Sequence, residues 1–338
     1  MKKINFGKIE RAVLFGGGKY LCSFALKLRA KKIPIVVFTS KRYLPDVVRR
    51  DGTTFDIFLK KGGIDFFPSE DINTDSQIDK FMSPRTLALS FGAPWIFKKD
   101  FIKKFRGKLL NAHSTRLPRY RGGASYSWQI LTNDRLGAGT IHQIEPGIDN
   151  GKIVKQKVYV FPESCLTPAN YFDFNYRILE KFLSEFLSEL LAQRDFKLTE
   201  QNEKESSYFP RLNTLEQGFI NWQWRAHEID RFVRAFSYPY PGASTYLGNR
   251  RLFLKRSRIE SGDKSHQFAA GLVLRKSQKE LFVAAVGGTV VVKDVFGDDQ
   301  KNLFDEVRVG DRLFTPAARL ESAMAFKAVY TPEGPKKL

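Results

Sequence analysis

The segment from residue 12 to residue 39 constrains the fold more than any other part of the chain. An apolar run, Ala12–Phe15, is followed by the glycines Gly16–Gly18, a stretch of helical character, and a second apolar run, Ile35–Thr39. Two short buried strands joined through a helix form a βαβ unit, whose strands are parallel. The sequence therefore predicts an α/β domain with a Rossmann-like parallel sheet covered by helices.

The three glycines after the first strand could cradle a phosphate group. The dinucleotide-binding fingerprint G-x-G-x-x-G would need glycine at position 21, where this chain has Leu21. We therefore interpret the glycines as a tight strand-to-helix turn, and not as a site for a nicotinamide or flavin cofactor.

Further strands are predicted at Leu87–Ser90 and Lys108–Ala112, where short apolar runs end in turn-forming residues. Thr167 and Pro168 are a suitable N-cap and first residue for a long helix that reaches about Arg194. An apolar stripe at helical spacing along this helix indicates core packing. Its members are Tyr171, Phe174, Ile178, Phe182, Phe186 and Leu190.

A chain of 338 residues suits two domains. The sequence turns polar at Lys197–Ser207, and beyond it short β-runs alternate with Gly, Asn and Asp, with one helix at about Ala226–Phe236. Such spacing is typical of a small closed or partly closed barrel. We expect a first domain at 1–198, a linker at 199–210 and a smaller, β-rich, OB-like domain at 211–330.

The formal net charge of +20 raises the question of a nucleic-acid partner. The excess of basic residues is spread almost in proportion to length, which makes a nucleic-acid groove improbable. One local basic cluster lies between Lys98 and Arg121, where Asp100 is the only acidic residue. This cluster suits a small anionic ligand, and equally a solvated face without a ligand.

The N-terminal segment lacks the apolar core and cleavage site of a signal peptide, and no apolar run is long enough to cross a membrane. Cys22 and Cys165 lie far apart without a partner pattern, so neither a disulfide framework nor a zinc site is expected. We expect a cytoplasmic protein with reduced thiols, no metal and no membrane partner.

Three polar residues stand in apolar surroundings. Asn111 and His113 are two positions apart at the end of a predicted strand, so their side chains share a face. Asp149 follows a glycine-containing turn after a later strand, and parallel neighbours would bring it to the same edge. The aspartate can orient the imidazole, the histidine can move a proton, and the asparagine can donate to an oxyanion.

This triplet suits acyl transfer to an amine through a tetrahedral intermediate. Ser114 alone is a poor nucleophile, so we expect direct attack by the substrate amine. On spacing alone, a purely structural role for the three residues remains the more frequent alternative.

The surrounding residues carry a resemblance to a known family. "NAHSTRLPRYRGG" followed by "GIDNGKIV" resembles the signature of the 10-formyltetrahydrofolate-dependent formyltransferases. "YFPRLNTLEQGFINWQWRAHEIDRF" is similar to the junction with the C-terminal domain in methionyl-tRNA and nucleotide-sugar formyltransferases. The resemblance covers roughly residues 10–255 and implies the formyltransferase fold.

The resemblance implies that Asn111 binds the formyl oxygen, His113 acts as base and oxyanion partner, and Asp149 orients His113. It implies 10-formyltetrahydrofolate as co-substrate, held between two loops with no metal. The expected folate-binding residues are Phe91, Gly92, Ala93, Trp95, Ile96, Gly147 and Ile148.

The strings "STRLP" and "RGGASYSWQI" look more like the enzymes that formylate amino sugars on nucleotide diphosphates. This implies a nucleotide-linked deoxyamino sugar as acceptor, used in surface polysaccharide synthesis. Because guanidinium groups match phosphate bidentately, most of the expected diphosphate or sugar contacts are arginines. The candidates are Arg116, Arg119, Arg121, Tyr208 and Arg211.

Two alternatives remain open: a methionyl-tRNA formyltransferase, which would need a basic face for tRNA, and a catalytically silent scaffold that keeps the fold. The identity of the nucleotide and of the sugar, the position of the amine and the formation of a homodimer are also left open.

Overall fold

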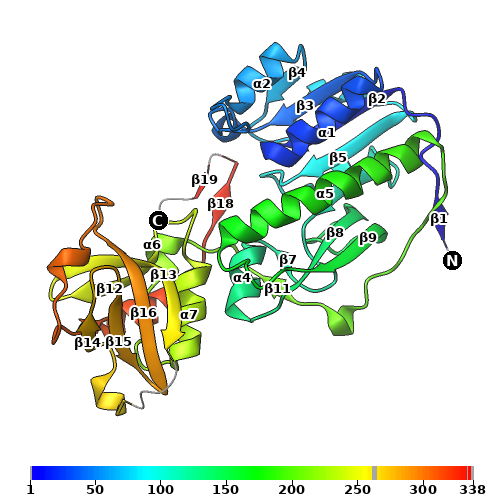
Figure 1. Cartoon of the computed structure of the whole chain (residues 1–338). Coiled ribbons are helices and arrows are strands. Elements are labelled where there is room, and N and C mark those ends of the chain that lie inside the picture. The colour runs from blue at the N-terminus through cyan, green and yellow to red at the C-terminus, as the bar shows by residue number, and fades with distance from the viewer. Residues whose placement is uncertain (1, 261–264, 333, 336–338) are drawn as a thin grey trace.

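The computed structural model describes residues 2–260, 265–332 and 334–335. Its larger part is built on a seven-stranded sheet with the order β4-β3-β2-β5-β6-β8-β9 (Figure 1). The strands are β2 (Arg11–Gly16), β3 (Ile35–Thr39), β4 (Asp65–Pro68), β5 (Thr86–Phe91), β6 (Leu109–His113), β8 (Leu136–Gln143) and β9 (Ile153–Val160). The helices of this part are α1 (Gly18–Ala30), α2 (Phe55–Lys61), α3 (Lys99–Lys103), α4 (Ser125–Leu131) and α5 (Pro168–Leu191).

The sheet confirms the predicted α/β class and the βαβ unit, since β2 and β3 are parallel and α1 joins them. The strands from β4 to β6 are all parallel to their neighbours. The last two strands differ, because β8 is antiparallel to β6 and β9 is antiparallel to β8. The expectation that Asp149 follows a strand parallel to that of Asn111 is therefore wrong, and a loop has to bring it back.

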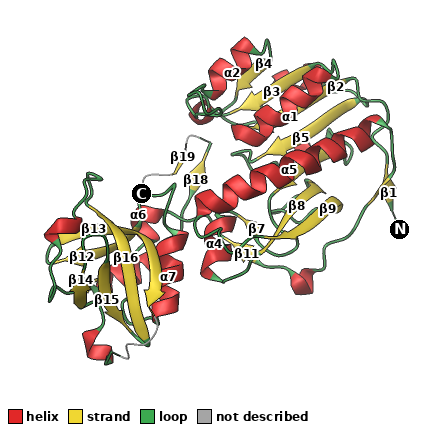
Figure 2. Ribbon diagram, in the orientation of Figure 1, coloured by secondary structure: helices red, strands yellow, loops and turns green. Residues whose placement is uncertain are grey.

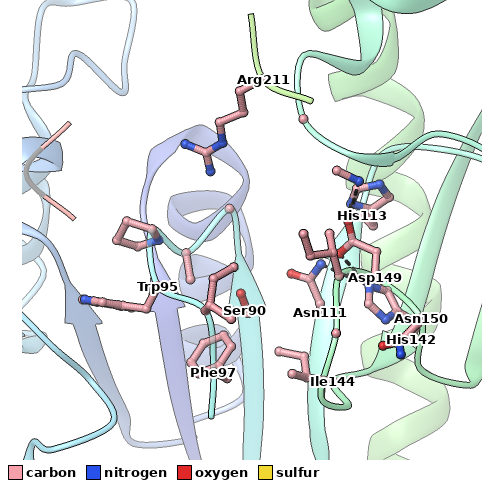
Figure 3. Close-up of a pocket in the computed structure, with 18 of the residues that line it drawn as sticks. Ser90, Trp95, Phe97, Asn111, His113, His142, Ile144, Asp149, Asn150 and Arg211 are labelled. Atoms are coloured by element: carbon pink, nitrogen blue, oxygen red, sulfur yellow. Dashed lines mark hydrogen bonds and ion pairs between the residues drawn. The ribbon is translucent and has the colours of Figure 1, made fainter. Parts of the chain in front are cut away.

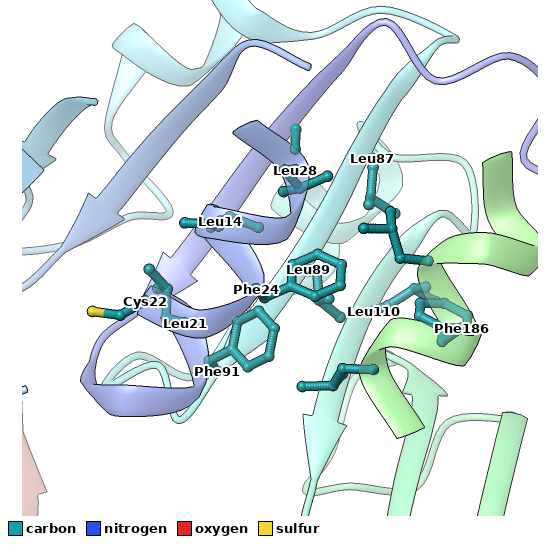
Figure 4. Close-up of a cluster of buried hydrophobic side chains, with 14 of the residues drawn as sticks. Leu14, Leu21, Cys22, Phe24, Leu28, Leu87, Leu89, Phe91, Leu110 and Phe186 are labelled. Carbon is teal, nitrogen blue, oxygen red and sulfur yellow. The ribbon is translucent and has the colours of Figure 1, made fainter. Parts of the chain in front are cut away.

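Both faces of the sheet are buried, as expected for a parallel sheet between helices. Along β2, Ala12 and Leu14 pack on one side while Val13 and Phe15 pack on the other, and none of these side chains is exposed. Figure 4 shows the first of these cores, where α1 and α5 lie against the sheet. Helix α5 approaches closely because Gly139 has no side chain; a Cβ there would lie 2.4 Å from Leu179 Cδ2.

Helix α5 confirms the predicted cap. The Thr167 hydroxyl accepts a hydrogen bond from the Asn170 amide, and the Asn170 side chain accepts one from the Thr167 amide. The helix ends at Leu191, slightly before the predicted Arg194. Most of the predicted apolar stripe is buried, including Tyr171, Phe182, Phe186 and Leu190.

The smaller part is an antiparallel sheet with the order β14-β15-β16-β13-β12-β17. Its strands are β12 (Ala243–Leu247), β13 (Arg250–Glu260), β14 (Val273–Lys276), β15 (Leu281–Ala285), β16 (Gly288–Phe296) and β17 (Leu313–Phe314), and α7 (Ala226–Ala235) packs on it. The sheet curls until its two ends meet, where the Leu313 amide donates to the Gly271 carbonyl at 2.8 Å. The predicted closed or partly closed barrel is therefore confirmed (Figure 2).

The two parts share one apolar cluster. Ile130 of α4 and Tyr171 of α5 belong to the same cluster of buried side chains as Phe232 of α7. The Ser127 hydroxyl also donates to the Ala235 carbonyl at 2.8 Å. This shared packing fixes how the barrel sits against the larger domain.

Short elements complete the chain. They are β1 (Lys3–Ile4), β7 (Arg121–Gly122), β10 (Phe196–Lys197), β11 (Tyr208–Phe209), α6 (Thr214–Gln217), α8 (Ala317–Ala325), β18 (Tyr330–Thr331) and β19 (Gly334–Pro335). Strand β11 pairs with β7, so the chain leaving the larger domain runs along its surface before it enters the barrel. Within the described residues, none of the helices combines the length and apolar character needed to span a membrane.

Replacing Phe186 with Ala should lower the free energy of unfolding by about 3–5 kcal/mol, because the fully buried ring lies between α5 and the sheet. Lys181→Ala on the exposed side of the same helix is the control, with an expected change within about 0.5 kcal/mol. Urea denaturation of both variants measures the difference. Equal effects would contradict the described packing.

Candidate active site

Three polar side chains lie side by side across neighbouring strands. In the register of the sheet, Ser90 of β5 is next to Asn111 of β6, and Asn111 is opposite His142 of β8. His113 is two positions beyond Asn111, so its side chain is on the same face. The end of β6 therefore presents an amide and an imidazole to one cavity (Figure 3).

His142 is a residue that the sequence analysis missed. Its ring is buried, and its Nδ1 lies 2.8 Å from the Gln143 carbonyl oxygen, which can only accept. In the neutral ring Nε2 is then an acceptor, and Asn111 Nδ2 donates to it at 3.1 Å. The second hydrogen of the Asn111 amide is left for a ligand.

A weak signal for His142 exists in the sequence. Thr140 and His142 are polar residues at alternate positions of an otherwise apolar strand, which places both on one face. Without the pairing of β6 with β8, nothing indicated that this face is the one that carries Asn111.

His113 is held from two sides. Its Nε2 lies 3.3 Å from the Tyr120 carbonyl oxygen, and its Nδ1 lies 3.9 Å from Asp149 Oδ2. Because the carbonyl can only accept, Nε2 carries the hydrogen in the neutral ring and Nδ1 is free to take up a proton. The imidazolium formed in that way would face the Asp149 carboxylate.

Asp149 reaches the site on a loop that doubles back after β8. Its backbone has a φ of 50°, in the left-handed region that aspartate tolerates better than most residues. The loop passes close to β8, since a Cβ on Gly151 would lie 1.9 Å from the Gln143 carbonyl oxygen. The side-chain amide of Gln201 donates to the Asp149 carbonyl at 2.7 Å and holds the loop from outside.

The Asp149 carboxylate faces one backbone donor and two imidazole rings. The Gly122 amide donates to Oδ2 at 2.9 Å, and Oδ1 lies 3.6 Å from His142 Nε2. Burial alone would raise the pKa of Asp149, but the neighbouring His113 and His142 and the Gly122 amide hold the pKa well below its usual range. The carboxylate therefore stays ionised where an imidazole titrates.

The cavity in front of these residues has a volume of about 300 Å³. Six of the seven residues expected to bind folate line it: Gly92, Ala93, Trp95, Ile96, Gly147 and Ile148. Phe91 does not, because its side chain is on the opposite face of β5 from Ser90 and packs on Phe24 in the core (Figure 4). Phe97 and Asn150, which belong to the two loops expected to hold the folate, also line it, whereas Ser90, Gly123, Ile144 and Tyr330 escaped the sequence analysis.

The five residues expected to bind the acceptor divide into two groups. Tyr208 and Arg211 line the cavity. The other three, Arg116, Arg119 and Arg121, do not line it. Arg116 forms an ion pair with Asp134 at 3.1 Å, and Arg121 forms one with Glu203 at 2.7 Å. The side chain of Arg119 is exposed. Their role in substrate binding stays a prediction.

The basic cluster from Lys98 to Arg121 does not form the wall of the cavity either. Lys103 pairs with Asp100 and Lys104 pairs with Asp79, and none of the lysines of the cluster lines the cavity. This placement favours a solvated face.

Neither a metal site nor a reactive thiol is evident in the part of the chain that the structure describes. Within these residues, no group of three or more His, Cys, Asp or Glu side chains is placed to hold a metal ion. Cys22 is buried with a free thiol whose pKa is raised to about 12 by burial.

Comparison with protein-family models identifies the class of this site. Residues 12–167 match the formyl transferase model, and residues 213–303 match the model of the formyl transferase C-terminal domain. Together the two matches span most of the chain, and the first includes Asn111, His113, His142 and Asp149. The chain belongs to the formyl transferase family.

Solved structures with the same fold include sugar N-formyltransferases. WlaRD, described as a sugar 3N-formyl transferase in the presence of dTDP and 5-N-formyl-THF, is 19% identical with a TM-score of 0.65, over 85% of this chain and 98% of that one. The N-formyltransferase from Helicobacter canadensis is 18% identical with a TM-score of 0.65, over 85% of this chain and 100% of that one. HypX from Aquifex aeolicus is 15% identical with a TM-score of 0.56, over 87% of this chain and 47% of that one.

The rate of formyl transfer should fall as the pH is lowered from about 8 to about 5, because only the neutral imidazole of His113 can accept a proton. Asp149 should add no acid limb of its own, since its lowered pKa keeps it ionised throughout this range. Measuring kcat/KM against pH tests the assignment. A flat profile would contradict it.

Asp149→Asn should lower kcat by about 100-fold or more, because the amide keeps the shape of the side chain but does not stabilise the imidazolium. Asparagine also tolerates the left-handed backbone, so the loop should keep its course. Steady-state kinetics of this variant are compared with those of Asp173→Asn, whose side chain is exposed on α5. A loss of less than tenfold would show that the charge of Asp149 is dispensable.

Proposed function

We propose that this protein transfers a formyl group from 10-formyltetrahydrofolate to the amine of a nucleotide-linked deoxyamino sugar. The observation that carries the proposal is the convergence of Asn111, His113 and Asp149 on one cavity in a chain of the formyl transferase family. The surrounding residues supply what such a transfer needs: an oxyanion donor, a base and a fixed carboxylate.

In the proposed reaction the sugar amine attacks the formyl carbon and forms a new C–N bond. The formyl oxygen becomes an oxyanion, which the free hydrogen of the Asn111 amide stabilises. His113 takes the amine proton at Nδ1, and the bond from the formyl carbon to N10 of the folate then breaks as N10 receives a proton from His113. The products are the formamide and tetrahydrofolate, so atoms and protons balance.

The cavity fits a pterin. Trp95, Phe97 and Ile144 give it apolar walls, and the Trp95 indole is fixed by a hydrogen bond to the Glu70 carbonyl at 3.2 Å. Asn150 Oδ1 is buried in the same cavity without a hydrogen-bond partner among the described residues. A buried acceptor of this kind is costly unless a ligand donates to it, and a pterin ring carries suitable N–H groups.

The preference for a sugar acceptor has three supports. The Helicobacter canadensis enzyme is described in complex with folinic acid and dTDP-3-aminofucose, and the sequence strings at residues 114–130 resemble those of sugar-modifying relatives. Five of the nine basic side chains between Lys98 and Arg121 pair with an acid among the described residues, which disfavours a continuous surface for tRNA in this region. We further propose that the protein acts in the cytoplasm and that its domains extend over 1–198 and 211–330.

Purified protein should formylate at least one nucleotide-linked amino sugar in a panel supplied with 10-formyltetrahydrofolate, and His113→Ala should lower the rate by about 100-fold or more. His227→Ala, which removes an exposed imidazole on α7, is the matched control and should be as active as the wild type. Mass spectrometry of the sugar product measures the transfer.

Methionyl-tRNA belongs in the same assay. Formylation of this acceptor alone, with binding that weakens steeply with salt, would replace the sugar assignment by the tRNA one. Full activity in His113→Ala would remove the proposed mechanism.

A further inference from the structure

The C-terminal segment of the chain returns to the larger domain. After α8, residues 326–332 run from the barrel to the region beside the cavity, where β18 stands between the two domains (Figure 1). The Ser40 hydroxyl donates to the Pro332 carbonyl at 2.6 Å, and the Arg42 guanidinium donates to the Thr331 carbonyl at 3.4 Å. This segment lies beyond the match to the C-terminal family model, which ends at residue 303.

Tyr330 is the residue of this segment that meets the site. Its hydroxyl donates to the Leu212 carbonyl at 3.1 Å, and its ring lies 4.9 Å from the guanidinium carbon of Arg211. Tyr330 and Ala328 both line the cavity of the proposed active site. The segment therefore supplies part of the cavity wall.

Arg211 lies between Tyr330 of this segment and Gly123 of the larger domain. Its stem lies against Gly123, where a Cβ would come within 2.4 Å of Arg211 Cγ. Figure 3 shows the guanidinium group over the cavity, on the side away from Phe97 and Ile144. The position is thus fixed by a glycine on one side and an aromatic ring on the other.

The charge of Arg211 is not neutralised by the protein. Among the described residues that line the cavity, Arg211 is the one Lys or Arg, and no described carboxylate lies within ion-pair distance of it. Arg116 and Arg121, by contrast, each have an acidic partner. A fixed, half-buried guanidinium without an acid beside it is suited to an anion that arrives with a ligand.

We propose that Arg211 binds an anionic group of a substrate at the mouth of the cavity, and that Tyr330 holds the guanidinium in position for this contact. The proposal rests on the proposed function and adds to it a binding residue and a positioning residue from the C-terminal segment. The anion is a carboxylate or a phosphate: the glutamate tail of the folate or the diphosphate of the acceptor.

Calorimetric titration of the full-length protein separates the two sources. The probes are 5-formyltetrahydrofolate and its uncharged analogue 5-formyltetrahydropteroyl amide, in which a primary amide replaces the glutamate, and then dTDP and UDP with their uncharged nucleosides. Arg211→Ala should weaken binding of either the folate or a nucleotide by about tenfold or more, and leave the matching uncharged analogue unaffected. Arg194→Ala, which removes an exposed arginine elsewhere, should change neither affinity.

Tyr330 is tested by the same titrations. Tyr330→Ala should weaken binding of the same ligand as Arg211→Ala does. Tyr330→Phe should retain most of the affinity, because the aromatic ring remains beside the guanidinium. The double variant should bind no more weakly than Arg211→Ala alone. Unchanged affinities in Arg211→Ala, or no binding of any probe by the wild type, would overturn the anion site. Unchanged affinity in Tyr330→Ala would overturn the role of the C-terminal segment.

The outcome is independent of the catalytic assignment. The titrations measure binding without turnover, so their result does not depend on the role assigned to His113. If the wild-type protein formylated none of the acceptors but still bound a probe in a way that depends on Arg211, the proposed reaction would be wrong. The proposal of an anion site would remain valid.

Discussion

The buried carboxylate of Asp149 is the constraint on which the arrangement of the site depends. A charged group inside a protein is stable only where polar groups surround it, and here these groups come from separate parts of the chain: the Gly122 amide, the imidazole of His113 on β6 and that of His142 on β8. Satisfying one side chain therefore fixes a loop and two strand positions relative to one another. The bond from Gln201 to the same residue extends this fixation to the segment that leads into the barrel.

Sequence patterns predicted those features of the structure that depend on interactions between residues close together in the chain. The βαβ unit, the cap of α5 and the shared face of Asn111 and His113 each depend on residues close together in sequence. The direction of β8 relative to β6 could not be predicted, because a buried apolar strand has the same sequence pattern whether it pairs in parallel or antiparallel. His142 and the partners of Arg121, which lie about 80 residues further on, depend on that pairing and on tertiary contacts.

The junction of the two domains has a functional meaning beyond stability. The apolar cluster shared by α4, α5 and α7 sets the position of the barrel, and with it the positions of Arg211 and Tyr330 at the mouth of the cavity. The chemical groups thus come from the larger domain, whereas part of the wall comes from segments that the barrel anchors. A net positive charge says little about such a site, because basic side chains such as Lys103 and Lys104 lie at the surface beside acidic partners and do not line the cavity.

Gly122 is a position of the site that tolerates few substitutions. Its amide donates a hydrogen bond to the Asp149 carboxylate, and its backbone pairs with β11. A Cβ at this position would lie 2.2 Å from the Phe209 carbonyl oxygen and 2.7 Å from the Tyr208 ring. With a φ of 97° the position also disfavours any other residue. Any side chain at position 122 would therefore disturb two things at once: the pairing of β7 with β11 and the amide that holds the Asp149 carboxylate in the cavity.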